Sequence, residues 1–136
     1  MKAALFEGHI APVYMDGDIP IFIETTRYCS VMYINFMKTL HGLPIKLLSQ
    51  MEFLAVHLSN RAFAIYERVG LTEDAIFLID NALEIFPDYT AGWINRALIM
   101  KQTGNTKEMK KSIEMAKSLN PGPRYSQAIM KIEQSI

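Results

Sequence analysis

Apolar side chains recur at helical spacing through the second half of the chain. Ala75, Ile79, Ala82 and Phe86 are separated by four, three and four positions, which places them on one face of an α-helix. The end of the chain carries a similar stripe, formed by Tyr125, Ile129, Ile132 and Ile136. We therefore expect residues 49–136 to form a run of short antiparallel helices, the last of them a capping helix with its apolar face turned inward.

Residues that start and stop helices flank these stripes. Ser49 and Glu52 form a capping box, which predicts a helix running from there to about Val69. The later boundaries are predicted by glycines that can adopt left-handed backbone, by prolines and by hydroxyl caps: Gly70, Gly104, Pro87, Pro121, Thr72, Thr90 and Thr106.

The boundary residues also repeat. Gly70, Ala82 and Pro87 recur 34 positions later as Gly104, Ala116 and Pro121, and Ala75 and Ile79 recur at the same offset as Met109 and Ile113. The triplet Asn60-Arg61-Ala62 recurs as Asn95-Arg96-Ala97 at an offset of 35. A period of 34 residues is typical of a helix–turn–helix repeat in which two equivalent helical hairpins lie side by side.

Residues 56–123 resemble two tetratricopeptide repeats. The second unit matches the family pattern at Trp93, Ala97, Gly104, Ala116 and Pro121, and the first at Tyr66, Gly70, Ala75, Ala82 and Pro87. The chain departs from the pattern at Ser59, where a large aromatic is usual, and at Phe63 and Met109, where small residues are usual. The resemblance implies a mainly α fold for residues 49–136, an α–α superhelix of two repeats with flanking helices.

A fold of this kind implies a groove that binds a peptide or a partner protein. The first helix of each repeat would line it, and the candidate contact residues are Asn60, Arg61, Ile94, Asn95, Leu98 and Lys101. The amide of Asn95 could bond to an extended peptide backbone. The alternative is that these side chains are solvated or take part in packing.

The first 28 residues predict a small β-hairpin. Val13, Tyr14 and Met15 precede Asp16-Gly17, a strong hairpin signal, and β-forming residues follow it as far as residue 24. An isolated hairpin is unstable in water, so it must pack on other elements. Residues 28–41 are apolar nearly all round and predict a buried helix, so that residues 29–48 would be an apolar helix and a linker.

The ends of this hairpin carry candidate chemistry. His9 precedes the first strand and Glu24 ends the second, 15 positions later. This arrangement resembles the back half of a transglutaminase-like (papain-like cysteine peptidase) domain. The resemblance implies that Glu24 would orient the imidazole of His9, which would activate a thiolate. The family's cysteine lies upstream, whereas Cys29 follows Glu24 and is interpreted as a structural thiol. Residues 1–28 would then be a catalytic remnant, inactive alone.

Composition excludes several classes of function. Lys and Arg number 14, as do Asp and Glu, so the net charge is zero and general nucleic-acid binding is not expected. The single cysteine and the isolated histidines predict no disulfide framework, no metal site and no cofactor. No apolar run reaches the ~20 residues of a membrane span.

Location and assembly are less constrained. No export signal precedes the first predicted strand, so a cytoplasmic location is the default, although a chain beginning partway through a domain would lack such a signal too. A homodimer formed through the strand edge and the apolar segment 28–41 is a third alternative to a binding module and an enzyme fragment.

Overall fold

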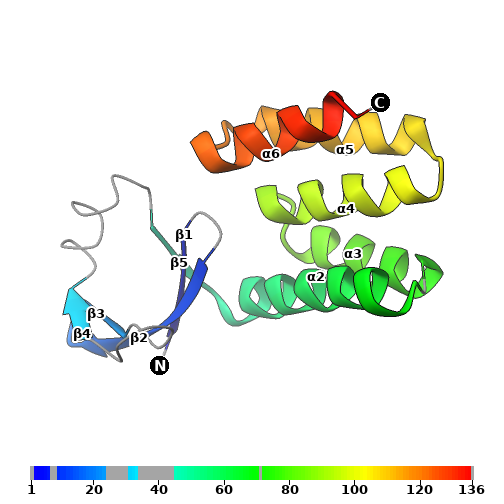
Figure 1. The fold of residues 1–136 in the computed structure, drawn as a ribbon. Coiled ribbons are helices and arrows are strands. Elements are labelled where there is room, and N and C mark those ends of the chain that lie inside the picture. Colours follow the sequence, from blue (N-terminus) through cyan, green and yellow to red (C-terminus); the bar gives the residue numbers. More distant parts are fainter. Residues whose placement is uncertain (1, 7–8, 24–30, 34–44, 71, 136) are drawn as a thin grey trace. The chain divides into compact units, whose positions relative to one another are not determined.

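The computed structural model describes residues 2–6, 9–23, 31–33, 45–70 and 72–135. The chain divides into two compact units, Met1–Phe53 and Leu54–Ile136. The first is a small antiparallel sheet and the second is a stack of helices (Figure 1). Each unit is described separately below.

The sheet unit contains five short strands in the spatial order β4-β3-β2-β1-β5, with every neighbouring pair antiparallel. The strands are β1 (Lys2–Phe6), β2 (His9–Asp16), β3 (Ile19–Ile23), β4 (Val31–Tyr33) and β5 (Lys46–Leu48). Ala4, Ala11 and Val13 are its buried centre, and Met15 and Ile45 pack against them. The small alanines pair directly across β1 and β2.

The predicted hairpin is confirmed as the β2–β3 pair. Asp16 pairs with Ile19, so the two-residue loop is Gly17-Asp18 rather than Asp16-Gly17. Gly17 has a φ of +58°, and Asp18 does not share this positive sign. A positive φ at the first loop position alone is the type II′ arrangement, in which glycine is favoured at that position.

The helix predicted for residues 28–41 is wrong for the part that can be described. Val31–Tyr33 form β4 and pair with β3, while Lys46–Leu48, predicted as linker, form β5 and pair with β1. A short run that is apolar on all sides suits a buried strand as well as a helix. The remaining residues of this segment, Cys29 and His41 among them, lie outside the described residues.

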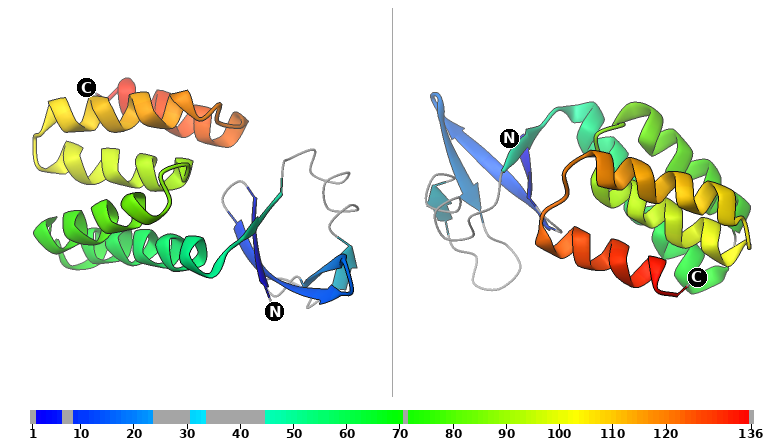
Figure 2. Two further views of the ribbon diagram at one scale, coloured as in Figure 1. Left: turned by 180° about the vertical axis from the view of Figure 1, so that it is seen from behind. Right: turned by 90° about the horizontal axis from the view of Figure 1, so that it is seen from above.

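The helical unit follows the predicted boundaries closely. The described residues contain five helices: α2 (Gln50–Val69), α3 (Thr72–Ile85), α4 (Thr90–Gln102), α5 (Thr106–Ser118) and α6 (Pro123–Glu133). Consecutive helices pack as pairs, and the views in Figures 1 and 2 agree that α4 lies between α2 with α3 and α5 with α6. The fold is therefore mainly α, with a small N-terminal sheet.

Positions related by 34 residues are buried to the same degree in the two pairs. Ala82 and Ala116 are both fully buried, and Ile79 and Ile113 are both core residues. The first pair packs around Ala62, Ala75, Ile79, Leu83 and Ile99, and the second around Ile94, Ala97, Met100, Met109, Ile113, Ala116, Ile129 and Ile132. Trp93 packs against both clusters, so the two pairs share a continuous core.

Most helix ends use the predicted signals. Ser49 and Glu52 bond reciprocally, from Ser49 N to Glu52 Oε2 at 2.8 Å and from Glu52 N to Ser49 Oγ at 3.2 Å. Gly70 and Gly104 have φ values of +70° and +72°, which a β-carbon would make costly. The capping box and both glycine stops are confirmed.

Two predicted caps are displaced by one residue. Asn105, not Thr106, caps α5, because its side chain accepts a bond from Glu108 N at 3.2 Å. Tyr89, not Thr90, holds the cap position of α4, and no side chain bonds there. Both threonines are instead the first residues of their helices. Thr72 begins α3 and donates its hydroxyl to Gly70 O at 3.2 Å.

Candidate functional site

The first helices of the two pairs, α2 and α4, are linked by a buried polar contact. Ser59 in α2 is fully buried, and its Oγ accepts a bond from Asn95 Nδ2 in α4 at 3.1 Å. The hydroxyl thus has a partner, as a polar group removed from water requires. A large aromatic in place of Ser59, which the repeat pattern favours, would leave no room for this bond.

A groove opens between the second halves of the same two helices. Its volume is about 420 Å³, and it is lined by Phe63, Tyr66, Glu67, Gly70, Thr72, Leu98 and Gln102. Phe63 and Leu98 provide apolar surface, and the rings of Phe63 and Tyr66 lie 5.9 Å apart between centroids, tilted by 46°. The groove therefore combines an apolar base with polar groups on the same helices.

The polar groups of the groove are only loosely engaged. Tyr66 Oη lies 3.5 Å from Gln102 Oε1, which is long for a bond between two oxygens. Glu67 is exposed and is the only formally charged side chain among the lining residues. The phenol and the amide are accessible to a ligand, and the carboxylate favours a cationic one.

The six predicted contact residues do not lie together: some are in the core, one lines the groove and others are on the surface. Leu98 lines the groove, whereas Ile94 belongs to the core with 7% of its surface exposed. Asn95 is engaged with Ser59, and Lys101 Nζ donates to Ser135 Oγ at 2.5 Å. The exposed residues Asn60 and Arg61 lie on α2 but do not line the groove. Ile94 is thus a packing residue, and of the six only Leu98 lies in the groove.

The sequence analysis missed most of the groove, although a signal was present. The offset of 35 that relates the first helices pairs Phe63 with Leu98 and Glu67 with Gln102. Both pairs line the same groove. Applying the offset to residues beyond the Asn-Arg-Ala triplet would have identified them.

A charged cluster centred on Arg96 connects three helices. Its Nε lies 2.7 Å from Asp80 Oδ1 in α3, and its second guanidinium nitrogen, NH2, lies 3.0 Å from Glu108 Oε2 in α5. NH1 donates to Ser112 Oγ at 2.8 Å, and Ser112 is fully buried. The planar guanidinium donates in all three directions. The Arg96 side chain is only 12% exposed, whereas Asp80 is 47% exposed. The cluster thus holds the pairs together, and its open side borders a pocket of about 290 Å³.

The candidate catalytic pair can be placed only in part. His9 is the first residue of β2, where it pairs with Phe6 of β1, and β3 ends at Ile23. Glu24 lies outside the described residues. The two strand ends belong to adjacent antiparallel strands, but the geometry of the proposed His–Glu contact is not described.

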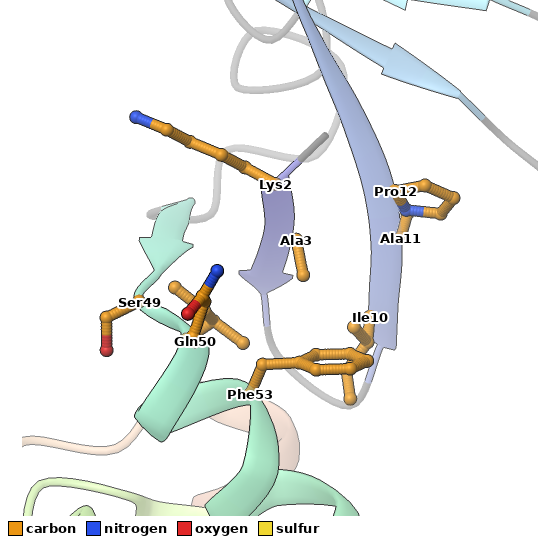
Figure 3. Close-up of a pocket in the computed structure, with 9 residues that line it drawn as sticks. Lys2, Ala3, Ile10, Ala11, Pro12, Ser49, Gln50 and Phe53 are labelled. Atoms are coloured by element: carbon orange, nitrogen blue, oxygen red, sulfur yellow. The ribbon is translucent and has the colours of Figure 1, made fainter.

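The sheet unit also contains an open cavity of about 710 Å³. Figure 3 shows the ring of Phe53 beside Ile10, while the side chains of Lys2 and Ser49 extend away from them. The lining is mostly apolar, with Ala3, Ile10, Ala11, Pro12, Leu48 and Phe53 as its apolar members. The cavity therefore offers mainly packing surface.

One ionised group of the sheet unit is strongly held. The carboxylate of Glu52 lies 2.6 Å from Lys46 Nζ. This bond to Lys46, followed by the bond from Ser49 N, lowers the pKa of Glu52 below its ordinary value. Glu52 thus joins strand β5 to the first turn of α2 as an anion.

Within the described residues, no cluster of histidine, cysteine and acidic side chains could hold a metal ion. In the same part of the chain, no helix combines the length and apolar character needed to cross a bilayer.

Comparisons with models of known protein families, with curated proteins and with solved structures gave no match to this chain.

Proposed function

We propose that the helical unit is a tetratricopeptide-type module that binds a peptide segment of a partner protein in the groove between α2 and α4. The observation that carries this proposal is the groove itself, about 420 Å³ in volume, because two pairs of its lining residues, Phe63 with Leu98 and Glu67 with Gln102, are related by the 35-residue offset. The 34-residue period and the matched burial of Ala82 and Ala116 support the family assignment.

The groove favours a peptide with an apolar side chain next to a basic one. Phe63 and Leu98 would contact the apolar side chain, and Glu67 would attract the Lys or Arg beside it. The phenol of Tyr66 and the amide of Gln102 would bond to the peptide backbone, because their mutual contact of 3.5 Å is weak enough to be replaced.

A library of displayed peptides selected on the intact chain would test this function. We expect enriched peptides to carry an apolar residue beside Lys or Arg. Their affinity should fall about tenfold with Glu67→Lys, which corresponds to about 1.4 kcal/mol. Glu114→Lys is the matched control, because Glu114 is an exposed carboxylate on α5 that does not line the groove. Equal losses in both variants, or no enriched peptide, would exclude the groove as the binding site.

A second candidate function is that of a fragment of a transglutaminase-like thiol enzyme. The observation that motivates it is the strand order: β2 begins at His9, and the antiparallel β3, which pairs with Val13–Asp16 of β2, ends one residue before Glu24. No cysteine precedes His9 in the chain, so we expect no peptidase or acyl-transfer activity. Turnover of an acyl donor that His9→Ala abolishes would show instead that the chain is a working enzyme.

A further inference from the structure

One face of the first helix pair, α2 and α3, is equivalent by the repeat to the face of α4 and α5 on which the preceding helix α3 packs. By the offsets of 35 and 34, Arg61 in α2 is equivalent to Arg96 in α4, and Asp74 in α3 is equivalent to Glu108 in α5. In the second pair, Arg96 bonds both to Glu108 of its own pair and to Asp80 of the preceding helix α3. This contact shows how such a face is covered when another helix packs on it.

On the first pair, none of the described helices covers the charged groups of this face in that way. Arg61 and Asp74 are exposed, and neither has an ion pair or side-chain hydrogen bond within the described part of the chain. Leu78 replaces the hydroxyl that Ser112 offers to Arg96. The described residues also provide no counterpart of Asp80 on this side. Arg61 thus lacks the two acceptors that complete the bonding of Arg96.

Apolar side chains surround these charges. Phe77 is 68% exposed, and its equivalent on α5 is Lys111, which lies beside Asp80 and Leu83 of the preceding helix. Leu58 and Ile65 are half-buried on α2, at positions equivalent to Trp93 and Met100. By helical spacing, Leu58 and Ile65 flank Arg61, and Phe77 lies next to Asp74. An apolar patch that is combined with polar groups in this way is typical of an interaction surface.

We propose that this face, formed by Leu58, Arg61, Ile65, Asp74 and Phe77, binds the same face of a second copy of the chain. The argument for a second copy is charge complementarity, because the face carries a cation, Arg61, and an anion, Asp74, and neither is paired within the residues that the structure describes. A twofold axis brings Arg61 of one copy to Asp74 of the other, and the reverse, in a single arrangement. A partner that carried only acidic groups would satisfy Arg61 and repel Asp74.

Sedimentation of the intact protein tests this assembly. We expect a dimer at about 100 µM, since a contact with a Kd of about 10 µM would be largely formed at that concentration. Phe77→Asp should give a monomer with an unchanged helical circular dichroism spectrum. Met130→Asp is the matched control, because Met130 is also an exposed apolar residue, 53% exposed, but lies on α6; this variant should remain a dimer.

Charge reversals identify the contact. Arg61→Asp and Asp74→Arg should each weaken the dimer at least tenfold, because each places like charges together, and the double variant should restore it. A wild-type monomer at this concentration would overturn the proposal. A dimer that persists in Phe77→Asp and in both single reversals would overturn it as well, since the contact would then lie elsewhere.

Discussion

Arg96 Nε lies 2.7 Å from Asp80 Oδ1 and thereby connects α4 of the second helix pair to α3 of the first. The guanidinium is largely buried and also bonds to α5 through Glu108 and Ser112. Arg96 lies where the two helix pairs meet. Its bond to Asp80 therefore acts between the pairs, and its bond to Glu108 acts within the second pair. The contact explains how a short stack of helices keeps a fixed arrangement of its pairs.

Replacing Arg96 with lysine should destabilise the helical unit by about 1–2 kcal/mol. An ammonium group cannot donate in three fixed directions, so acceptors among Asp80, Glu108 and Ser112 lose their bonds. Urea unfolding followed by the fluorescence of Trp93, the only tryptophan, would measure the change in the free energy of unfolding.

A solvent-exposed ion pair is the comparison. Lys117 and Glu133 contact each other at 2.5 Å, with side chains 51% and 42% exposed, and Lys117→Met should cost less than about 1 kcal/mol. Equal costs for Arg96→Lys and Lys117→Met would contradict the role given to the Arg96 cluster.

Gly92→Ala should destabilise the protein by about 1 kcal/mol, although alanine is the better helix former. A β-carbon at this position would lie 2.8 Å from Tyr89 Cδ1 and 2.9 Å from Leu83 Cδ2. The ring of Tyr89 is buried and stacks on Phe86 at 5.4 Å, so it has little freedom to move. Overpacking of about 1–3 kcal/mol should therefore exceed the gain in helix propensity of about 1 kcal/mol.

Thermal and urea unfolding of Gly92→Ala would show whether the substitution lowers or raises the stability of the protein. A rise in stability would mean that Tyr89 and Leu83 yield easily and that the close approach of α4 to α3 does not depend on glycine.

Asn105→Ala should cost about 1 kcal/mol, and Thr106→Ala only a few tenths. The side chain of Asn105 satisfies Glu108 N at the start of α5, whereas Thr106 is already inside the helix. Both substitutions remove a small polar side chain at the start of α5. Thr106→Ala therefore controls for the loss of a polar group that does not cap the helix. A larger loss for Thr106→Ala in urea unfolding would place the cap where the sequence alone suggested.

Stability should depend on the ionisation of Glu52. Its pKa is lowered in the folded chain by Lys46 and Ser49. The resulting stabilisation is therefore present above the ordinary glutamate pKa of about 4.3 and is lost as the pH falls through the lower folded value. Glu52→Gln keeps a side chain suited to the capping box and removes the charge.

The difference in unfolding free energy between wild type and Glu52→Gln measures this effect. We expect wild type to be the more stable at pH 7 and the difference to decline below about pH 4.3. A difference that stays constant from pH 7 to pH 3 would show that the Lys46 contact does not depend on the charge of Glu52.

The helical unit could be predicted well because its signals are local and repeat. Gly70 and Gly104 end helices through their own backbone conformation, and the capping box of Ser49 and Glu52 forms within four residues. The recurrence of Ala82 as Ala116 predicted two similar packing sites, and both are fully buried. The cap of α5 was predicted one residue too late, at Thr106 instead of Asn105, because both neighbouring residues have side chains that can cap a helix.

The sheet and the groove were harder to predict because they depend on contacts between distant residues. Strands β1 and β5 pair with each other through Ala3 and Leu48, and no turn signal in the sequence joins segments so far apart. Val31–Tyr33 lie in a run that is apolar on all sides, which was interpreted as a buried helix although a buried strand has the same pattern. In the groove, Phe63 departs from the tetratricopeptide pattern, which prefers a small residue there, so it was not among the predicted contact residues.

The bond between Ser59 and Asn95 limits how α2 and α4 can slide past each other. A shift of one helical turn, about 5.4 Å, would separate the hydroxyl from the amide. The fully buried Ser59 would then have neither Asn95 nor water as a hydrogen-bond partner. Each orphaned polar group would cost about 1–3 kcal/mol, a large fraction of the stability of a small domain. Purely aliphatic neighbours would permit such a shift at little cost. This single hydrogen bond therefore fixes the register of α2 against α4.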